Sequence, residues 1–211
     1  MVGQQPARLA VAAASAALLM FSLAGCAPSG TDSGSATPSP SPSISDADPT
    51  PLPTAEPLIL PGCQDLLPLT AAKDLFSPST EILEESDTAA DVHFDLGELD
   101  TAAANATIAK NCIWGVPNSD GAFTVTVSDI NDTDAANLKA ALLSAGYLGV
   151  TTDGVTTLEL STDGELGAVA RTHYLVADLW IYVDGGSLSF SGDVADRVLD
   201  KIRTANPSRA Y

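Results

Sequence analysis

The feature that most constrains this chain is a low-complexity segment that ends near Pro57. Between residues 27 and 57 the chain consists largely of Ser, Thr, Pro, Gly, Ala and Asp, and it includes a Ser-Pro repeat. Such a segment cannot bury enough apolar surface to offset the entropy lost on folding. We therefore expect a disordered linker over residues 26–57. Folding is then restricted to residues 58–211, which are enough for one globular domain with one hydrophobic core.

The residues before this linker have the pattern of a lipoprotein signal peptide. Arg8 is the only charge before an apolar run at residues 9–21, which is too short to span a membrane. The sequence Leu-Ala-Gly-Cys at residues 23–26 matches a lipobox, in which the Cys26 thiol accepts a diacylglyceryl group. Two or more acyl chains hold a protein stably at a membrane. We expect a signal peptide at residues 1–25 and a lipid anchor at Cys26 on the extracytoplasmic face of the cell membrane. The alternative is an ordinary secretory signal with a chance cysteine.

The charge of the mature chain excludes one class of partner. Arg8 is the only one of the nine basic residues that precedes Cys26, so eight basic and 27 acidic residues remain, a formal charge of −19. Nucleic-acid binding requires clustered Lys and Arg, so no nucleic-acid partner is expected. An anionic lipid surface would also repel this domain. The expected membrane contact is therefore the anchor at Cys26, and the acidity itself is typical of a very soluble domain.

Two cysteines, Cys63 and Cys112, remain once Cys26 is lipidated. In an exported chain we expect them to form a disulfide, and the alternative is a pair of free buried thiols. Closing a loop of about 50 residues would stabilise the fold by about 4 kcal/mol in the chain-entropy model. No Cys-x-x-Cys motif occurs, so a redox motif or a structural zinc site has no support.

Hydrophobic periodicity predicts an α+β domain. Helices are expected at residues 70–76, 102–110, 134–145 and 193–204, and strands at residues 111–116, 122–130, 155–161, 166–173 and 177–183. The acidic stretch at residues 81–100 has no regular pattern. Short connections between the strands favour antiparallel pairing. We therefore expect an antiparallel sheet of about five strands, with helices packed on one face, one disulfide, and Trp114 and Trp180 in or near the core.

Several motifs follow one another in a recognisable order. A lipobox and a linker precede Cys63, Leu66-Leu67 and a short helix; Cys112-Ile113-Trp114 then opens a hairpin, and Leu-Trp-Ile-Tyr-Val at residues 179–183 precedes a last helix. Over residues 61–204 this order resembles actinobacterial cell-envelope lipoproteins of unknown function that share a Cys…Cys-x-Trp core. The resemblance implies a Cys63–Cys112 disulfide and an α+β domain, and it supplies no catalytic residues.

The usual catalytic and metal-binding motifs are missing from the sequence. It contains no Gly-x-Ser-x-Gly, Ser-x-x-Lys, His-Glu-x-x-His, Walker or Gly-x-Gly-x-x-Gly pattern. We interpret the two histidines, His93 and His173, as surface or half-buried residues and not as general bases. The acidic residues between Lys73 and Lys110 could hold Ca²⁺, but their spacing fits no calcium loop, and the stretch that starts at Asp129 lacks the required Gly and Glu. No catalytic residue, metal or cofactor is predicted.

Three functions remain. We favour a membrane-tethered extracytoplasmic module that binds or senses a protein or cell-wall partner, because a long linker would display the domain. The second is a carrier of an apolar small molecule or lipid in a pocket between sheet and helices, which would require a cavity of some hundreds of Å³. The third, an extracytoplasmic enzyme, is disfavoured and would need polar side chains converging near His173 or the carboxylates.

Overall fold

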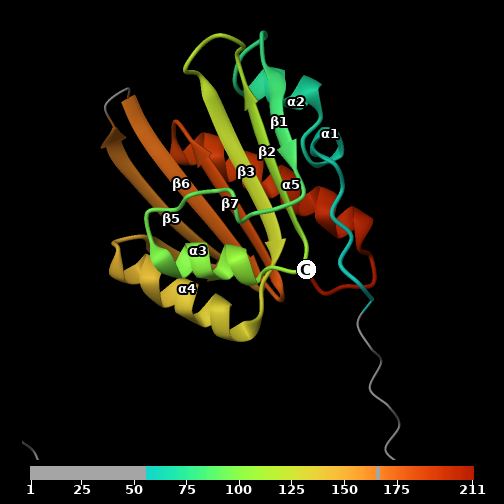
Figure 1. Ribbon diagram of the computed structural model, residues 1–211, viewed down its shortest axis with the longest axis vertical. Helices are drawn as coiled ribbons and strands as arrows, with labels where there is room; N and C mark the ends of the chain where they lie inside the picture. The colour runs from blue at the N-terminus through green and yellow to red at the C-terminus, as the bar shows by residue number, and fades with distance from the viewer. Residues whose placement is uncertain (1–55, 165–166) are drawn as a thin grey trace, which may run out of the picture. The chain divides into compact units, whose positions relative to one another are not determined.

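The computed structural model describes residues 56–211 except 165 and 166, so the predicted signal peptide, Cys26 and most of the linker lie outside the described residues. One antiparallel sheet dominates the described part. Its strands are β1 (Glu81–Ser86), β2 (Ala109–Gly115), β3 (Ala122–Asp129), β4 (Leu148–Thr152), β5 (Val155–Gly164), β6 (Gly167–Val176) and β7 (Leu179–Gly185). They lie in the order β1-β2-β3-β7-β6-β5-β4 (Figure 1). The sheet therefore has seven strands, more than the five expected.

Five helices accompany this sheet in the described residues: α1 (Cys63–Leu66), α2 (Leu69–Leu75), α3 (Gly97–Asn105), α4 (Asp132–Ser144) and α5 (Leu188–Ala205). Side-chain caps explain where the two longest begin. The side chain of Asn131 accepts a hydrogen bond from the Asp134 N–H at 2.9 Å, and that of Ser187 accepts one from the Phe190 N–H at 3.3 Å. Each cap satisfies a backbone donor that would otherwise lack a partner in the first helical turn.

The helices cover both faces of the sheet, so the prediction of helices on one face is wrong. Alternate residues of β7 point to opposite faces. Leu179, Ile181 and Val183 join a core with α1, α2 and α5, whereas Trp180 and Tyr182 join a second core with α3 and α4. Figure 1 shows α3 and α4 in front of the sheet and α5 behind it. The physical reason is that β7 is apolar at every position from residue 179 to residue 183, which is typical of a strand buried on both faces.

The acidic stretch at residues 81–100 is more regular than its sequence suggests. Residues 81–86 form the edge strand β1, which pairs with β2 and with no other strand of the described residues. Because most of its side chains remain exposed, β1 lacks the apolar alternation that would have revealed it. The expected helix at residues 102–110 is displaced toward the N-terminus. It ends at Asn105 because Ala106 has extended backbone angles, and the following residues enter β2.

The predicted Cys63–Cys112 disulfide is confirmed, and it joins α1 to β2 with a Cα–Cα distance of 5.8 Å. Both cysteines are fully buried in the core that contains α5. Trp114 lies two residues beyond Cys112 and stacks on Phe123 with ring centroids 5.5 Å apart. The expectation that Trp114 and Trp180 are core residues is also confirmed, since their exposed fractions are 0% and 1%.

The disulfide makes a testable contribution to stability. We expect the double substitution Cys63→Ala and Cys112→Ala to lower the free energy of unfolding by about 4 kcal/mol, because the bridged residues are 49 positions apart. Urea denaturation of the mature chain carrying Cys26→Ser would measure this change. The same chain without the double substitution should lose a similar amount in reducing agent. A loss below about 1 kcal/mol in both experiments would contradict the prediction.

Candidate functional site

Exposed large apolar side chains gather at one edge of the sheet. In the described part of the chain, five such side chains are exposed: Ile59, Leu83, Leu143, Leu148 and Val150. Three of the five belong to α4 and β4, which are consecutive in the chain. Leu148 and Val150 are the most exposed of these five, at 77% and 65%. Single exposed apolar residues are common, whereas a group of them near one place is a candidate binding surface.

The connection from α4 to β4 sets the position of these side chains. After α4 the chain turns at Gly146, whose φ is +93°, and it is then fixed by the buried ring of Tyr147. In the next strand, Leu148 lies opposite Glu159 and Val150 opposite Thr157 of β5. Among the strands of the described residues, none pairs with the other side of β4, because β4 is the last strand in the sheet order.

Apolar atoms lie on both faces of this edge strand. Leu148 and Val150 are two residues apart and therefore share one face. Residues that pair across neighbouring antiparallel strands point to the same face, and Leu148 pairs with Glu159 of β5, which pairs with Thr172 of β6. The Thr172 and Ser191 hydroxyls are hydrogen-bonded at 2.8 Å, and Ser191 belongs to α5. Leu148 and Val150 therefore lie on the face that α5 covers. On the opposite face, a side-chain methyl of Leu143 lies 3.2 Å from the position that a Cβ on Gly149 would take. A strand added beside β4 would find apolar contacts on both sides.

The two edges of the sheet differ in charge. The edge strand β1 exposes Glu81, Glu84 and Glu85, and such charges oppose pairing with another strand. By contrast, β4 has the sequence Leu-Gly-Val-Thr-Thr, with no charge and no proline, and all five residues are exposed. The β4 edge therefore lacks the usual protection against strand addition. We call this edge strand, together with Leu143, the β4 surface.

A hollow of about 220 Å³ adjoins the β4 surface between the β4–β5 hairpin and α5. It is lined by Thr152, Asp153, Val155, Thr157, Tyr174, Asp196, Leu199 and Arg203. The Tyr174 hydroxyl donates a hydrogen bond to Asp196 at 2.8 Å. Burial and this carboxylate together raise the pKa of Tyr174, so the phenol stays protonated. The Arg203 Nε–H donates a hydrogen bond to the backbone oxygen of Tyr211 at 3.1 Å. The free charge that this hollow offers a ligand is therefore mainly negative.

His173 lies in the interior, which corrects the interpretation of it as a surface or half-buried residue; His93 is exposed as expected. Trp180 donates its indole N–H to His173 Nδ1 at 3.2 Å. Burial, helped by the nearby Arg171 charge, lowers the pKa of His173 to about 3. The ring is therefore neutral at pH 7 and its accepting nitrogen is already used. His173 is a core residue and not a general base.

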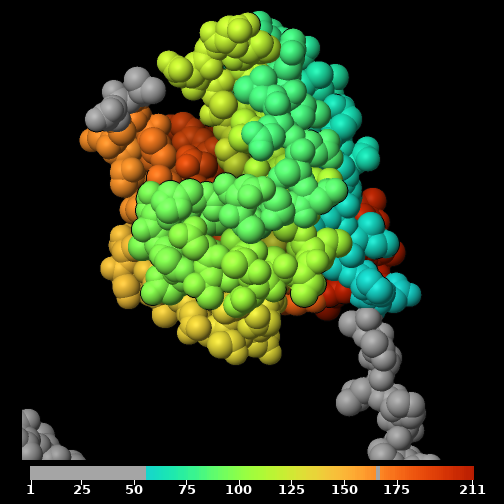
Figure 2. All heavy atoms as spheres, viewed as in Figure 1, coloured from blue at the N-terminus to red at the C-terminus, as the bar shows by residue number. Residues whose placement is uncertain are grey.

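The charged residues near His173 form ion pairs and hydrogen bonds with one another. Arg171 contacts Asp95 at 2.5 Å and Asp184 at 3.5 Å, and the Tyr182 hydroxyl donates to Asp184 at 3.0 Å. The hollow among these residues measures only about 50 Å³. The position of Asp95 explains the role of this charged group. Asp95 belongs to the segment between β1 and α3, which lies over this face of the sheet (Figure 2). These ion pairs fasten that segment to the sheet.

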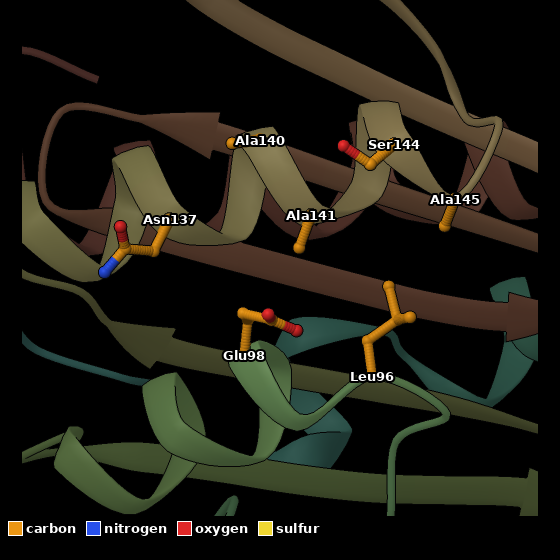
Figure 3. Close-up of a pocket in the computed structure, with 7 residues that line it drawn as sticks. All are labelled: Leu96, Glu98, Asn137, Ala140, Ala141, Ser144 and Ala145. Atoms are coloured by element: carbon orange, nitrogen blue, oxygen red, sulfur yellow. The ribbon is translucent and has the colours of Figure 1, made fainter.

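A hollow of about 710 Å³ forms an open groove between α3 and α4. Figure 3 shows Leu96 and Glu98 directed toward α4, which presents mainly small side chains to the groove. The residues that line it are Leu96, Glu98, Asn137, Ala140, Ala141, Ser144 and Ala145. A carrier of an apolar molecule would need an enclosed apolar cavity, and this groove is open and partly polar.

The remaining residues considered as sites have structural roles. Asp129, where a calcium loop was considered, accepts hydrogen bonds from the backbone N–H groups of Thr107 at 2.7 Å and Ile108 at 3.0 Å. Within residues 56–211, leaving aside 165 and 166, no three His, Cys, Asp or Glu side chains gather closely enough to hold a metal ion. Four strands separate β2, which carries Cys112, from β4. The disulfide is thus remote from the β4 surface.

Comparison of the chain with protein-family models, curated proteins and solved structures found no match. Among the helices of the described residues, none is both long and apolar enough to cross a membrane.

The burial of His173 predicts a pH dependence of stability. Its pKa is about 3 in the folded protein and about 6.5 in the unfolded chain, so only the unfolded chain takes up a proton between these values. The stabilisation is complete above pH 6.5 and falls as the pH is lowered. Between pH 7 and pH 5 the mature chain should lose about 2 kcal/mol more than its His173→Phe variant, measured by urea denaturation. The exposed-site variant His93→Phe should behave like the unsubstituted chain; equal losses in all three would contradict the prediction.

Proposed function

We propose that this protein is a lipoprotein of the cell membrane whose domain, displayed on the extracytoplasmic side, binds a partner protein through the β4 surface. The sequence of residues 1–26 supports the location, since charge, apolar run and lipobox occur in the required order. The long Ser/Thr/Pro-rich linker supports display of the domain away from the membrane. The observation that carries the binding role is the uncharged edge strand β4 with its exposed Leu148 and Val150.

Strand addition is the binding mode that this surface favours. The outer side of an edge strand presents unpaired backbone N–H and C=O groups, and an extended segment of a partner can pair with them. Backbone pairing alone has little specificity, so side-chain contacts must select the partner. Complete burial of one Leu or Val side chain contributes about 1.5–3 kcal/mol, and Leu148 and Val150 are largely available for such burial.

The carrier and enzyme functions have weaker support. Large aromatic and aliphatic side chains fill the space between the sheet and the helices on both faces, including Trp114, Phe123 and Trp180. The neutral, fully buried His173 is a poor general base, and Arg171 is held by two carboxylates. Native mass spectrometry of the mature chain distinguishes the carrier function, because a co-purifying mass of lipid size would favour it over the proposed one.

The lipid anchor can be tested directly. In its own host, the Cys26→Ser variant should lose fatty-acid labelling and should leave the membrane fraction, because the acylated thiol is absent. The neighbouring substitution Ala27→Ser should retain both properties. The anchor would be refuted if the Cys26→Ser variant were labelled and fractionated like the unsubstituted protein.

The binding role can be tested with a photo-crosslinking side chain at Thr151, an exposed residue of β4. In intact cells it should form a discrete adduct with a second protein. Val150→Lys, which puts a charge on the edge strand, should abolish the adduct. Leu83→Lys is the matched control, since Leu83 is an exposed apolar residue of the opposite edge strand β1. Adducts that are absent, or equal in the two variants, would contradict a binding role for β4.

A further inference from the structure

We infer that the partner segment is basic on one face: it places a Lys or Arg side chain opposite Thr152, on the α5 side of the sheet, next to apolar side chains opposite Leu148 and Val150. This inference rests on the proposed function, because it concerns the partner of the β4 surface.

The strand geometry assigns the positions of the partner side chains. Leu148, Val150 and Thr152 alternate along β4 and therefore share the face that α5 covers. In a strand paired with β4, the residues directly opposite these three would point to the same face, with their Cβ atoms about 5 Å away. Residues opposite Leu148 and Val150 would meet exposed apolar side chains. The residue opposite Thr152 would stand beside the hollow next to α5, because Thr152 is one of its lining residues.

The charges around that hollow favour a cation. Asp153 follows Thr152 in the turn, and Asp196 projects from α5; both are exposed and both line the hollow. The one basic residue in the lining, Arg203, already contacts Asp200 at 3.6 Å and the backbone oxygen of Tyr211. A long basic side chain from the partner could lie along Thr157 and Tyr174 while its charge approaches the two carboxylates. Both Lys and Arg have the apolar stem and terminal charge that this path requires.

The preference is confined to one face of the partner strand. On the α4 side, the exposed Lys139 precedes Leu143 by one helical turn, so a second basic side chain is not favoured there. A second copy of this chain is a poor occupant. It would bring another Asp153 and another excess of acidic residues to the same place, and each mature chain carries a formal charge of −19.

Synthetic peptides can test this inference on the whole mature chain carrying Cys26→Ser. The first peptide, acetylated and amidated Lys-Thr-Val-Thr-Val, puts Lys opposite Thr152 in an antiparallel pairing. The second has Glu in place of Lys, and the third, Thr-Lys-Val-Thr-Val, moves Lys to the other face. In NMR titrations we expect the first peptide to shift the amide signals of residues 148–152 and to bind about threefold more tightly than either control, as one partly exposed ion pair would give.

Charge reversal in the protein provides the complementary test. Asp196→Lys should reverse the preference so that the Glu peptide binds more tightly than the Lys peptide, whereas Asp65→Lys on α1 should leave the preference unchanged. Because Asp196 also accepts the Tyr174 hydroxyl, Asp153→Lys serves as a second variant that should weaken binding of the Lys peptide.

Three outcomes would overturn the inference: equal affinity for the three peptides, no shifts at residues 148–152, or a dimer of the mature chain that Val150→Lys dissociates. The last outcome would assign β4 to a second copy. Equal affinities together with a crosslink at Thr151 that Val150→Lys abolishes would leave the binding role standing and remove only the basic specificity. Absence of both the crosslink and the peptide shifts would remove the proposed function as well.

Discussion

The burial of β7 on both faces is the constraint on which the rest of the structure depends. Five consecutive apolar residues, 179–183, occupy the middle of the sheet, and no one-sided layer of helices could cover them. The chain meets this requirement with two cores. The C-terminal helix α5 and the disulfide-linked α1 cover one face, and α3 and α4 cover the other. Burial of His173 and Trp180 follows, because they lie in the second core or beside it, and their mutual hydrogen bond satisfies the indole N–H.

Helices that cover the middle of a seven-stranded sheet leave its edges open, and the protein treats the two edges differently. At β1, glutamates and the ion pairs of Lys110 with Glu85 and Asp87 make the edge polar. At β4, the strand carries neither charge nor proline, although the outer side of an edge strand is the usual target of unwanted pairing. This difference between the two edges supports the proposed binding role of β4.

The sequence predicted the fold class, the disulfide and the buried tryptophans because each depends on a local or compositional pattern. It failed at the two edge strands, both of which are mostly exposed. Most side chains of β1 are exposed, so its sequence shows no apolar alternation. In β4 all five residues are exposed, so its apolar residues do not mark a buried face. A signal for β4 was present in Asp153-Gly154, since both residues have positive φ and Asp-Gly is a favoured pair for a two-residue hairpin turn. The apolar run of β7 is typical of a strand that is buried on both faces, but such a run also occurs in strands buried on one face. Only the structure shows that helices cover both sides of β7.

The strong acidity of the domain and its unprotected edge are best understood together. An uncharged edge strand with exposed Leu148 and Val150 would promote self-association in a neutral protein. Here each copy carries a large excess of acidic residues, and the repulsion between like charges opposes approach of a second copy to the same edge. The same charge would attract the basic partner segment inferred above. On that proposal, the net charge would both oppose pairing between two copies of the chain at β4 and favour a partner of opposite sign.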